Sequence, residues 1–447
     1  MKKQWLALAL AAVCLLSACT TPGVGDESST EEISTTAPVE NEETTAEDTT
    51  ADESLSDTEA DETTAADSES TTESESESES KPEPEGTYVK LPDNGLIKDL
   101  FTSKDVYATR HSTSGEDGSI IKLNKWRSTE FVKTEGAYAV RYELTGRRSA
   151  YSVTFFDADQ QFISGIGTES FCSASAVVGC TPLPEGTEYV RFTYYTGSDG
   201  YCAMEEPMAQ LLATKADYDA YRSTLPLAGL KVACLGDSIT EGDYGERVGA
   251  KSVHMENYPY YLAKKWGCET TNYGWCGDTA ETFYNRFVQE EVDVSDADVV
   301  ILILGANLGL EGELGTYYRN IVDDVRGQLK NGATLVLCVP PYNTESTRGV
   351  EGKFFLYDFV VNARPIIFAL GEEYDLPVID IFTESPIQAE TESIYQPLDG
   401  IHLNREGYEV LADFIGGKLV SDVLPNTNIG DYPELDTKDL GEEDSFE

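Results

Sequence analysis

The sequence KVACLGDSITEG, residues 231–242, decides the fold of the C-terminal half of the chain. Lys231–Leu235 is a short and almost continuous apolar run, which is typical of a strand buried on both faces of a parallel sheet. Gly236 and Asp237 end this run, and Ser238 follows directly. In open parallel sheets, sites lie at the carboxyl ends of the strands. The sequence therefore places the Ser238 hydroxyl where it can meet a ligand.

The same rhythm continues after residue 242. Further strands are expected at Thr270–Tyr273, Asp298–Leu304, Thr334–Val339 and Val378–Ile381. Helices are expected at Tyr258–Trp266, Thr279–Glu290, Tyr317–Leu329, Phe354–Tyr374 and Arg405–Gly416. Alternating strands and helices predict a parallel five-stranded sheet with helices on both faces, a flavodoxin-like three-layer α/β/α domain. We place this domain at residues 225–425.

Residues 87–212 have a different pattern. Short runs such as Tyr151–Phe156 and Tyr189–Tyr195 are rich in aromatic and β-branched residues, and turn-forming residues separate them. Regularly spaced short strands of this kind predict an antiparallel β-sandwich, here jelly-roll-like. A short helix near Lys215–Arg222 then leads into the α/β domain.

The N-terminus has the features of an export signal. Lys2 and Lys3 precede the apolar run Trp5–Leu16, which is too short to span a bilayer comfortably. The run ends in Leu16-Ser17-Ala18-Cys19, which resembles the lipobox of bacterial lipoproteins. This resemblance implies lipidation of Cys19 and makes residues 1–19 a signal peptide. An ordinary signal peptide with an incidental cysteine is the alternative.

Residues 20–86 are mostly Ser, Thr, Glu, Asp and Ala, and Lys81 is the only basic residue among them. Such a segment cannot bury enough apolar surface to fold, so we expect a disordered, extended linker. Residues 426–447 form a second acidic tail. The net charge of −49 argues against nucleic acid as a partner. We therefore expect a bacterial cell-surface protein that meets the membrane only through Cys19.

Besides Cys14 and Cys19, the chain has Cys172, Cys180, Cys202, Cys234, Cys268, Cys276 and Cys338. Their number is odd, and no paired spacing suggests a zinc site. Cys234 and Cys338 lie in apolar strand runs, as packed thiols do. Disulfides Cys172–Cys180 or Cys268–Cys276 are compatible with an oxidising compartment, although the sequence does not demand either.

A serine nucleophile needs a base, and the base needs a group that orients it. His111 lies in the β-rich region, and His254 lies in a polar loop with only Glu256 close by in sequence. His402 follows Asp399 by three residues, and a D-x-x-H turn can bring carboxylate and imidazole together. We therefore expect His402 to be the base and Asp399 its partner.

Acyl transfer also needs donors for the oxyanion. Asn272-Tyr273-Gly274 ends the second expected strand, and Gly274 has no side chain to block its N–H group. Asn307 closes the third strand in Gly305-Ala306-Asn307, where its amide can donate.

The blocks GDSIT, NYG, GAN and DGIH, in this order, resemble the four signature blocks of SGNH (GDSL-type) hydrolases. The resemblance covers roughly residues 228–420. It implies Ser238 as nucleophile, Asp399 and His402 as the rest of a triad, and an oxyanion hole made by the Ser238 and Gly274 N–H groups and the Asn307 side chain. No metal or organic cofactor is needed. Many members have Asp where this chain has Leu308, which puts the shape of that loop in doubt.

Two neighbouring residues complete the expected site. We expect Asp237 and Trp275 to contact substrate, although a packed core tryptophan is the alternative for Trp275. We do not expect Cys276 to act as nucleophile, because no second histidine is placed to serve it.

These expectations define an extracellular serine esterase that acts through an acyl-enzyme. Its substrate is an acylated small molecule or polysaccharide, with acetyl esters of carbohydrate favoured by family and compartment. The β-rich region looks like modules that precede esterase domains, which suggests sugar contact or a purely structural role. An acyltransferase acting on sugars and a catalytically silent carbohydrate-binding surface protein remain as alternatives. The oligomeric state is not predicted.

Overall fold

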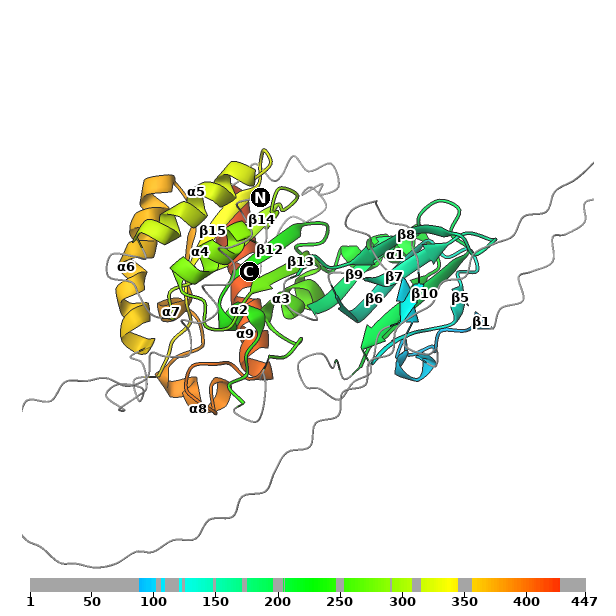
Figure 1. The fold of residues 1–447 in the computed structure, drawn as a ribbon, viewed down its shortest axis with the longest axis horizontal. Coiled ribbons are helices and arrows are strands. Elements are labelled where there is room, and N and C mark those ends of the chain that lie inside the picture. The colour runs from blue at the N-terminus through cyan, green and yellow to red at the C-terminus, as the bar shows by residue number, and fades with distance from the viewer. Residues whose placement is uncertain are drawn as a thin grey trace, which may run out of the picture. The chain divides into compact units, whose positions relative to one another are not determined.

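The computed structural model describes residues 88–426 except 102–105, 109–119, 123–124, 148–149, 171–174, 196–203, 205, 247–252, 290–291, 308–314 and 345–355 (Figure 1). The signal peptide, Cys19, the acidic linker and nearly all of the C-terminal tail lie outside the described residues. Those predictions therefore stay predictions. Across the part of the chain that is described, no helix is both long and apolar enough to cross a membrane.

The C-terminal half is built on a parallel five-stranded sheet. Its strands are β12 (Lys231–Gly236), β13 (Glu269–Gly274), β14 (Val299–Ile303), β15 (Thr334–Val339) and β16 (Val378–Asp380). They are ordered β13-β12-β14-β15-β16, and every neighbouring pair is parallel. This is the flavodoxin-like doubly wound order, in which the chain leaves the first strand in both directions. The expected fold is confirmed.

Helices cover both faces of the sheet (Figure 1). One face carries α4 (Ala280–Gln289), α5 (Arg319–Gln328) and α6 (Leu356–Tyr374), and the other carries α3 (Tyr258–Tyr261) and α9 (Arg405–Lys418). Successive side chains of a strand point to opposite faces. Accordingly, Val232 and Cys234 pack in the cluster of α3 and α9, whereas Ala233 and Leu235 pack in the cluster of α4, α5 and α6. Both faces of the sheet are buried under helices, so the strand sequences are continuous apolar runs.

Shorter elements complete the domain. They include α2 (Ser238–Glu241), a π-helical turn (Leu262–Trp266), α7 (Ile381–Glu384) and α8 (Glu392–Tyr395), and α1 (Lys215–Arg222) lies just before residue 225. The expected helix 258–266 is thus α3 continued by the π turn. The other long helices begin and end within two residues of their expected positions. The one-turn helices α2, α7 and α8 were not expected, because one turn is too short to show a helical period.

The preceding β-rich region has two main sheets. The larger sheet contains β1 (Tyr88–Val89), β4 (Trp126–Ser128), β5 (Phe131–Lys133), β7 (Tyr151–Phe156), β8 (Phe162–Gly167) and β10 (Tyr189–Tyr195). The smaller sheet contains β6 (Ala139–Gly146), β9 (Ser175–Pro182) and β11 (Met208–Leu212). A separate pair is formed by β2 (Val106–Ala108) and β3 (Ile120–Lys122). All pairings are antiparallel except the parallel pair β1 and β5, so the expected sandwich is correct apart from that edge.

The β-rich region and the α/β domain share contacts. The Ser170 hydroxyl donates to the carbonyl oxygen of Asn272 in β13 at 2.5 Å. Glu143 in β6 forms an ion pair with Lys264 at 2.9 Å and accepts a hydrogen bond from the Tyr260 hydroxyl at 3.4 Å. Side chains of both regions also belong to one apolar cluster. The α/β domain is therefore tied to the β-rich region by polar and apolar contacts, and its edge strand β13 by the Ser170 hydrogen bond.

Candidate active site

Ser238 lies where strand β12 turns into helix α2. Asp237 is the N-cap of α2, and its Oδ1 accepts a hydrogen bond from the Ile239 N–H at 3.0 Å. Ser238 is the first residue of the helix, so its own N–H has no intrahelical acceptor. The turn is tight: a Cβ at Gly274, on the neighbouring strand, would collide with the backbone N of Glu241. Glycine is needed at 274 because α2 passes directly against the end of β13.

Ser238, His402 and Asp399 form one hydrogen-bonded chain. His402 Nε2 is 2.9 Å from Ser238 Oγ, and His402 Nδ1 is 2.7 Å from Asp399 Oδ2. Asp399 Oδ1 also accepts the backbone N–H groups of Ile401 and His402, at 3.0 and 2.9 Å. The turn passes through Gly400 at φ 71°, in the left-handed region that favours glycine. The structure thus brings together the three residues predicted as a triad, although Ser238 and His402 are 164 residues apart in the chain.

The charges around His402 stabilise its protonated form. Burial alone would lower the pKa of His402, but its hydrogen bond to Asp399 and the charges of Asp243, Asp399 and Asp237 raise it above its ordinary value. Burial would likewise raise the pKa of Asp399, yet its hydrogen bonds to His402 and to the Ile401 N–H hold that pKa below its usual range. The pair therefore favours an imidazolium beside a carboxylate, which is the state that forms when serine gives up its proton.

Two of the three predicted oxyanion donors, the Gly274 N–H and the Asn307 amide, have protein partners in this conformation. The Gly274 N–H donates to Asn272 Oδ1 at 2.8 Å. Asn307 Nδ2 donates to the Asp278 carbonyl oxygen at 3.0 Å, which holds the amide at the end of β14. An amide NH₂ group has two donors, so this contact fixes Asn307 and leaves it one N–H for a ligand. The Gly274 N–H would have to be shared between Asn272 and an oxyanion.

The structure separates the two predicted substrate contacts. Asp237 is 0% exposed, and among the described residues its Oδ2 has no hydrogen-bond partner. Burial raises the pKa of Asp237 to about 7. Trp275 is 39% exposed at the end of β13, and the Arg286 guanidinium lies 5.6 Å from its ring centroid. Trp275 is therefore no core residue and can meet a ligand. Asp237 caps the helix, and its proposed substrate contact would need a change of conformation.

Two acidic residues beside the site were not singled out from the sequence. Asp243 Oδ2 lies 3.8 Å from His402 Nε2, the nitrogen that also contacts Ser238. Glu241 Oε2 accepts the Cys276 N–H at 2.6 Å, and the Cys276 thiol is 3.5 Å from Asp243 Oδ2. Both carboxylates follow Ser238 closely, in SITEGD. A turn predicted just after Ser238 would have brought them back beside the site. Burial, followed by the charges of Glu241 and Asp243, raises the pKa of Cys276, which keeps the thiol protonated and a poor nucleophile.

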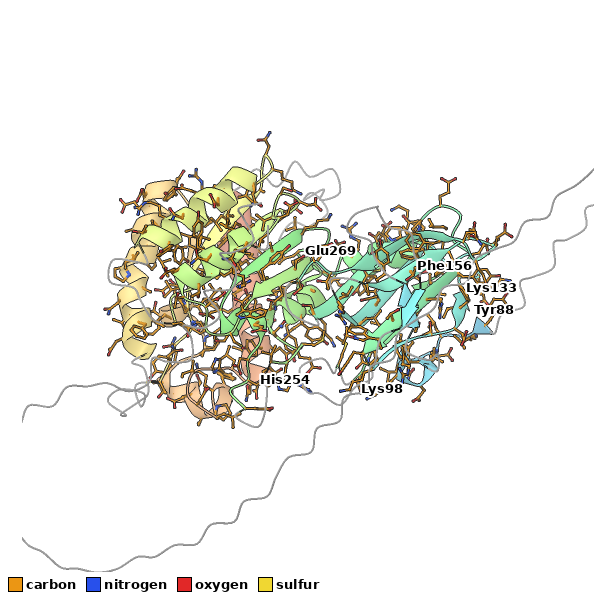
Figure 2. All side chains as sticks on the ribbon, in the orientation of Figure 1. Tyr88, Lys98, Lys133, Phe156, His254 and Glu269 are labelled. Carbon is orange, nitrogen blue, oxygen red and sulfur yellow. The ribbon has the colours of Figure 1, made fainter. Side chains whose placement is uncertain are left out.

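The remaining histidine and cysteine predictions have clear outcomes. His254 Nε2 lies 3.3 Å from Glu246 Oε2, and its ring stacks on Tyr244. Figure 2 shows the place of His254 on the ribbon. Its partners are thus those of a surface loop. Free thiols are present at Cys180, Cys234, Cys268, Cys276 and Cys338. The suggested disulfides Cys172–Cys180 and Cys268–Cys276 are therefore both wrong, since Cys180, Cys268 and Cys276 are free thiols. His111, Cys172, Cys202 and Leu308 lie outside the described residues.

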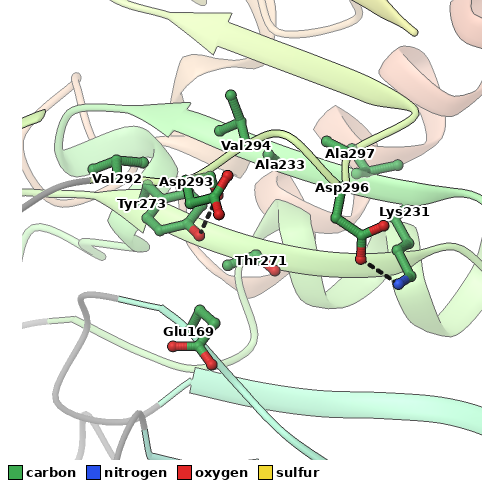
Figure 3. A pocket seen from close by; sticks show the side chains of 11 residues that line it. Glu169, Lys231, Ala233, Thr271, Tyr273, Val292, Asp293, Val294, Asp296 and Ala297 are labelled. Carbon is green, nitrogen blue, oxygen red and sulfur yellow. Dashed lines mark hydrogen bonds and ion pairs between the residues drawn. The ribbon is translucent and has the colours of Figure 1, made fainter. Parts of the chain in front are cut away.

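A cavity of about 380 Å³ lies beside β12 and β13, away from the hydrogen-bonded chain (Figure 3). Its lining includes Glu169, Thr271 and Tyr273 but not Ser238, Asp399 or His402. Lys231 is paired with Asp296, and the Tyr273 hydroxyl donates to the Asp293 carbonyl oxygen at 3.2 Å (Figure 3). These groups are satisfied by one another, so the cavity offers no feature of a reactive site.

A doubly wound sheet with a serine, a histidine and an aspartate linked at its carboxyl edge defines the class of α/β serine hydrolases. Within this class, residues 234–410 match the model of the GDSL-like Lipase/Acylhydrolase family, so the chain carries an SGNH hydrolase domain. The comparison with curated proteins gives no match.

Several solved structures are similar to the chain over less than half of its length. One is a lipase/acylhydrolase from Enterococcus faecalis, with 22% identity and a TM-score of 0.33 over 43% of this chain and 95% of that one. A second is a carbohydrate acetylesterase family member from Sinorhizobium meliloti, with 18% identity and a TM-score of 0.34 over 44% and 99%. A third is a variant of an acetyl-xylooligosaccharide esterase from Geobacillus Stearmophilus, with 18% identity and a TM-score of 0.30 over 42% and 93%.

Proposed function

We propose that the chain is a serine esterase in which Ser238 is the nucleophile, His402 the general base and Asp399 the group that orients the base. The observation that carries this proposal is the continuous chain of hydrogen bonds from Asp399 through His402 to Ser238. A hydroxyl becomes an effective nucleophile only when a base of this kind removes its proton. The raised pKa of His402 fits a base that holds this proton during the reaction.

The first half-reaction acylates the enzyme. As Ser238 Oγ bonds to the ester carbonyl carbon, its proton passes to His402 Nε2. The tetrahedral intermediate then breaks its bond to the alcohol oxygen, and this oxygen takes the proton from Nε2 as the alcohol leaves. In the second half, water gives a proton to Nε2 and its oxygen bonds to the acyl carbon. Ser238 Oγ then leaves and recovers that proton, and the acid is released.

Negative charge develops on the carbonyl oxygen in both halves. The N–H groups of Ser238 and Gly274 and the Asn307 amide are the proposed donors for it. All three lie at the carboxyl ends of neighbouring strands β12, β13 and β14 or directly after them. The partner that Gly274 has in the free enzyme, Asn272, can move aside when the charged oxygen offers a stronger hydrogen bond.

The proposed substrates are acyl esters of carbohydrates, with acetyl as the favoured acyl group. The exposed Trp275 ring next to the site supports this, because a flat aromatic face exposed beside polar groups suits a sugar ring. The proposed setting is the bacterial cell surface, where lipidated Cys19 and the acidic linker would tether the enzyme. Cys19→Ala should then release the protein from membranes or leave it unprocessed, and unchanged fractionation would contradict the anchor.

The function is tested with the full chain and two acetates. Purified protein should release p-nitrophenol from p-nitrophenyl acetate and acetate from acetylated xylo-oligosaccharides. Ser238→Ala, with the same circular dichroism spectrum, should release neither. A folded wild-type protein that cleaves no ester would favour the silent carbohydrate-binding alternative. A Ser238→Ala variant with wild-type rates would remove the nucleophile assignment.

A further inference from the structure

Asp243 occupies a fixed position at the site that the acyl-transfer chemistry does not itself require. Its backbone N–H donates to the Ser238 carbonyl oxygen at 2.9 Å, and its own carbonyl oxygen accepts the Tyr408 hydroxyl at 2.8 Å. Within its side chain, Oδ1 accepts the Gly245 N–H at 2.8 Å. These contacts hold the carboxylate in one orientation, with Oδ2 directed to His402 Nε2 at 3.8 Å. The Asp243 side chain is 18% exposed, so a ligand can reach it.

The path of the catalytic proton determines what comes close to this oxygen. In the acylation step, the alcohol oxygen receives its proton from His402 Nε2, so it must lie within hydrogen-bond distance of that nitrogen. Asp243 Oδ2 lies just beyond hydrogen-bond distance from the same nitrogen. The carbon that bears the leaving oxygen, and the carbon next to it, are thereby brought beside the carboxylate. The acyl group, held at the oxyanion donors, is not.

We infer that Asp243 accepts a hydrogen bond from a hydroxyl on the carbon adjacent to the esterified one, and so selects esters of sugars and other polyols over esters of simple alcohols. The inference rests on the proposed esterase function and narrows its substrate class. A carboxylate oxygen has room for more than one donor, so the weak contact from the Cys276 thiol at 3.5 Å does not prevent this bond. A simple alkyl ester cannot make it.

Two other roles for Asp243 predict different behaviour. If its carboxylate only tunes His402, which it contacts electrostatically, removing it affects every ester alike, also at a pH where the resting His402 is neutral, because the imidazolium still forms in the transition state. If it only positions the loop through Gly245, its removal again affects every ester alike. Only contact with the leaving alcohol makes the effect depend on the alcohol. The acetyl-enzyme is the same for all acetates, so its hydrolysis does not depend on which alcohol has left.

The test is a cycle of one substitution and one substrate change in the full chain. The substrates are a methyl xyloside with a single acetyl group beside a free hydroxyl, its analogue in which that hydroxyl is replaced by hydrogen, and ethyl acetate. The proteins are wild type, Asp243→Asn and the control Glu246→Gln, which removes an exposed carboxylate three residues further on. Values of kcat/KM are measured about two pH units above the acidic limb of each protein, where His402 is neutral.

With wild type, removing the hydroxyl should lower kcat/KM by at least about tenfold, the usual range for a hydrogen bond to a charged group. Asp243→Asn should lower kcat/KM for the hydroxylated ester about tenfold more than for the other two, because any loss through the charge on His402 is shared by all three esters. Glu246→Gln should change none of them. Equal losses on all three esters in Asp243→Asn overturn the inference and leave the esterase intact. Wild type that cleaves none of the esters overturns both.

The wild-type comparison also stands on its own should Asp243→Asn fail to fold. Equal rates of wild type on the hydroxylated ester and its deoxy analogue overturn the inference without any variant. Asp243→Glu supplies a third reading, because a carboxylate on a longer arm should keep part of the preference for the hydroxylated ester. Part of that preference retained in Asp243→Glu supports the contact with the alcohol, and its complete loss there counts against it.

Discussion

Two carboxylates beside the same serine and histidine are held in opposite ways. Asp399, in the turn before α9, receives hydrogen bonds from the His402 ring and from two backbone N–H groups, and its pKa is lowered. Asp237, at the end of β12, receives one hydrogen bond from the Ile239 N–H, and burial raises its pKa to about 7. Both side chains are largely shielded from water. The number of donors, more than burial, decides which of the two is a stable anion.

The turn that holds Asp399 and the end of β12 that holds Asp237 therefore have different functions. The turn Asp399–His402 supplies a permanent negative charge that orients the base. The end of β12 supplies rigidity, because Asp237 caps the helix that begins with the nucleophile. Substitutions in the turn should therefore act on rate, and substitution of Asp237 should act on stability.

The largest effect is expected at the reacting atoms themselves. Ser238→Ala and His402→Ala should each lower kcat by about three orders of magnitude or more, and the double variant should be no worse, because the two act as one unit. His254→Gln is the matched control, since its ring contacts only the loop residues Tyr244 and Glu246 among the described residues. Its rate should stay within about twofold of wild type. Turnover lost in His254→Gln but kept in His402→Gln would reverse the assignment of the base.

The two carboxylates themselves come next. Asp399→Asn should lower kcat by about two orders of magnitude or more, because an amide can neither enforce the ring tautomer nor stabilise the imidazolium. Asp237→Asn should lower it by less than about tenfold, since the amide oxygen can still cap α2. Rates with p-nitrophenyl acetate decide this. Similar losses in the two variants would mean that Asp237 takes part in the chemistry.

The acidic limb of the activity profile is the third measure. Activity needs neutral His402 and is lost as pH falls through its pKa, which lies above the reference of about 6.5. Removing the negative charge of Asp243 in Asp243→Asn lowers that pKa, so the limb should move to lower pH. Glu246→Gln should leave it in place. A limb well below about pH 6.5 in wild type would contradict the charge arrangement described here.

A separate effect, outside the reaction itself, is expected on stability. Because the folded-state pKa of Asp237 is raised, this group favours folding below its unfolded pKa of about 3.9, and that contribution is lost as pH rises through about 7. The free energy of unfolding of wild type, relative to Asp237→Asn, should therefore fall by up to about 4 kcal/mol between about pH 4.5 and pH 8. Urea unfolding at both pH values measures it. A constant difference would mean that Asp237 stays ionised.

Much of this could be predicted from the sequence, for a physical reason. Strands covered on both faces are apolar throughout, so β15 was expected at its observed residues, Thr334–Val339. The D-x-x-H spacing defines a single turn, so Asp399 and His402 could be paired without knowledge of the fold. Contacts that depend on where a chain goes after a turn could not. Asp243 reaches His402 only because Gly242 takes φ 103° after α2, and the parallel pairing of β1 depends on a strand of two residues.

The contact between Ser170 and Asn272 has a consequence for making the domain in isolation. Strand β13 is at the edge of the five-stranded sheet, and β9 of the β-rich region lies beside it. An uncovered edge strand offers its backbone to a second molecule. A fragment that begins at residue 225, the predicted domain boundary, would retain the sheet and its helices but expose this strand. We expect such a fragment to fold and then self-associate through β13, so that its concentration-dependent light scattering, more than its circular dichroism, reports the loss of the preceding region.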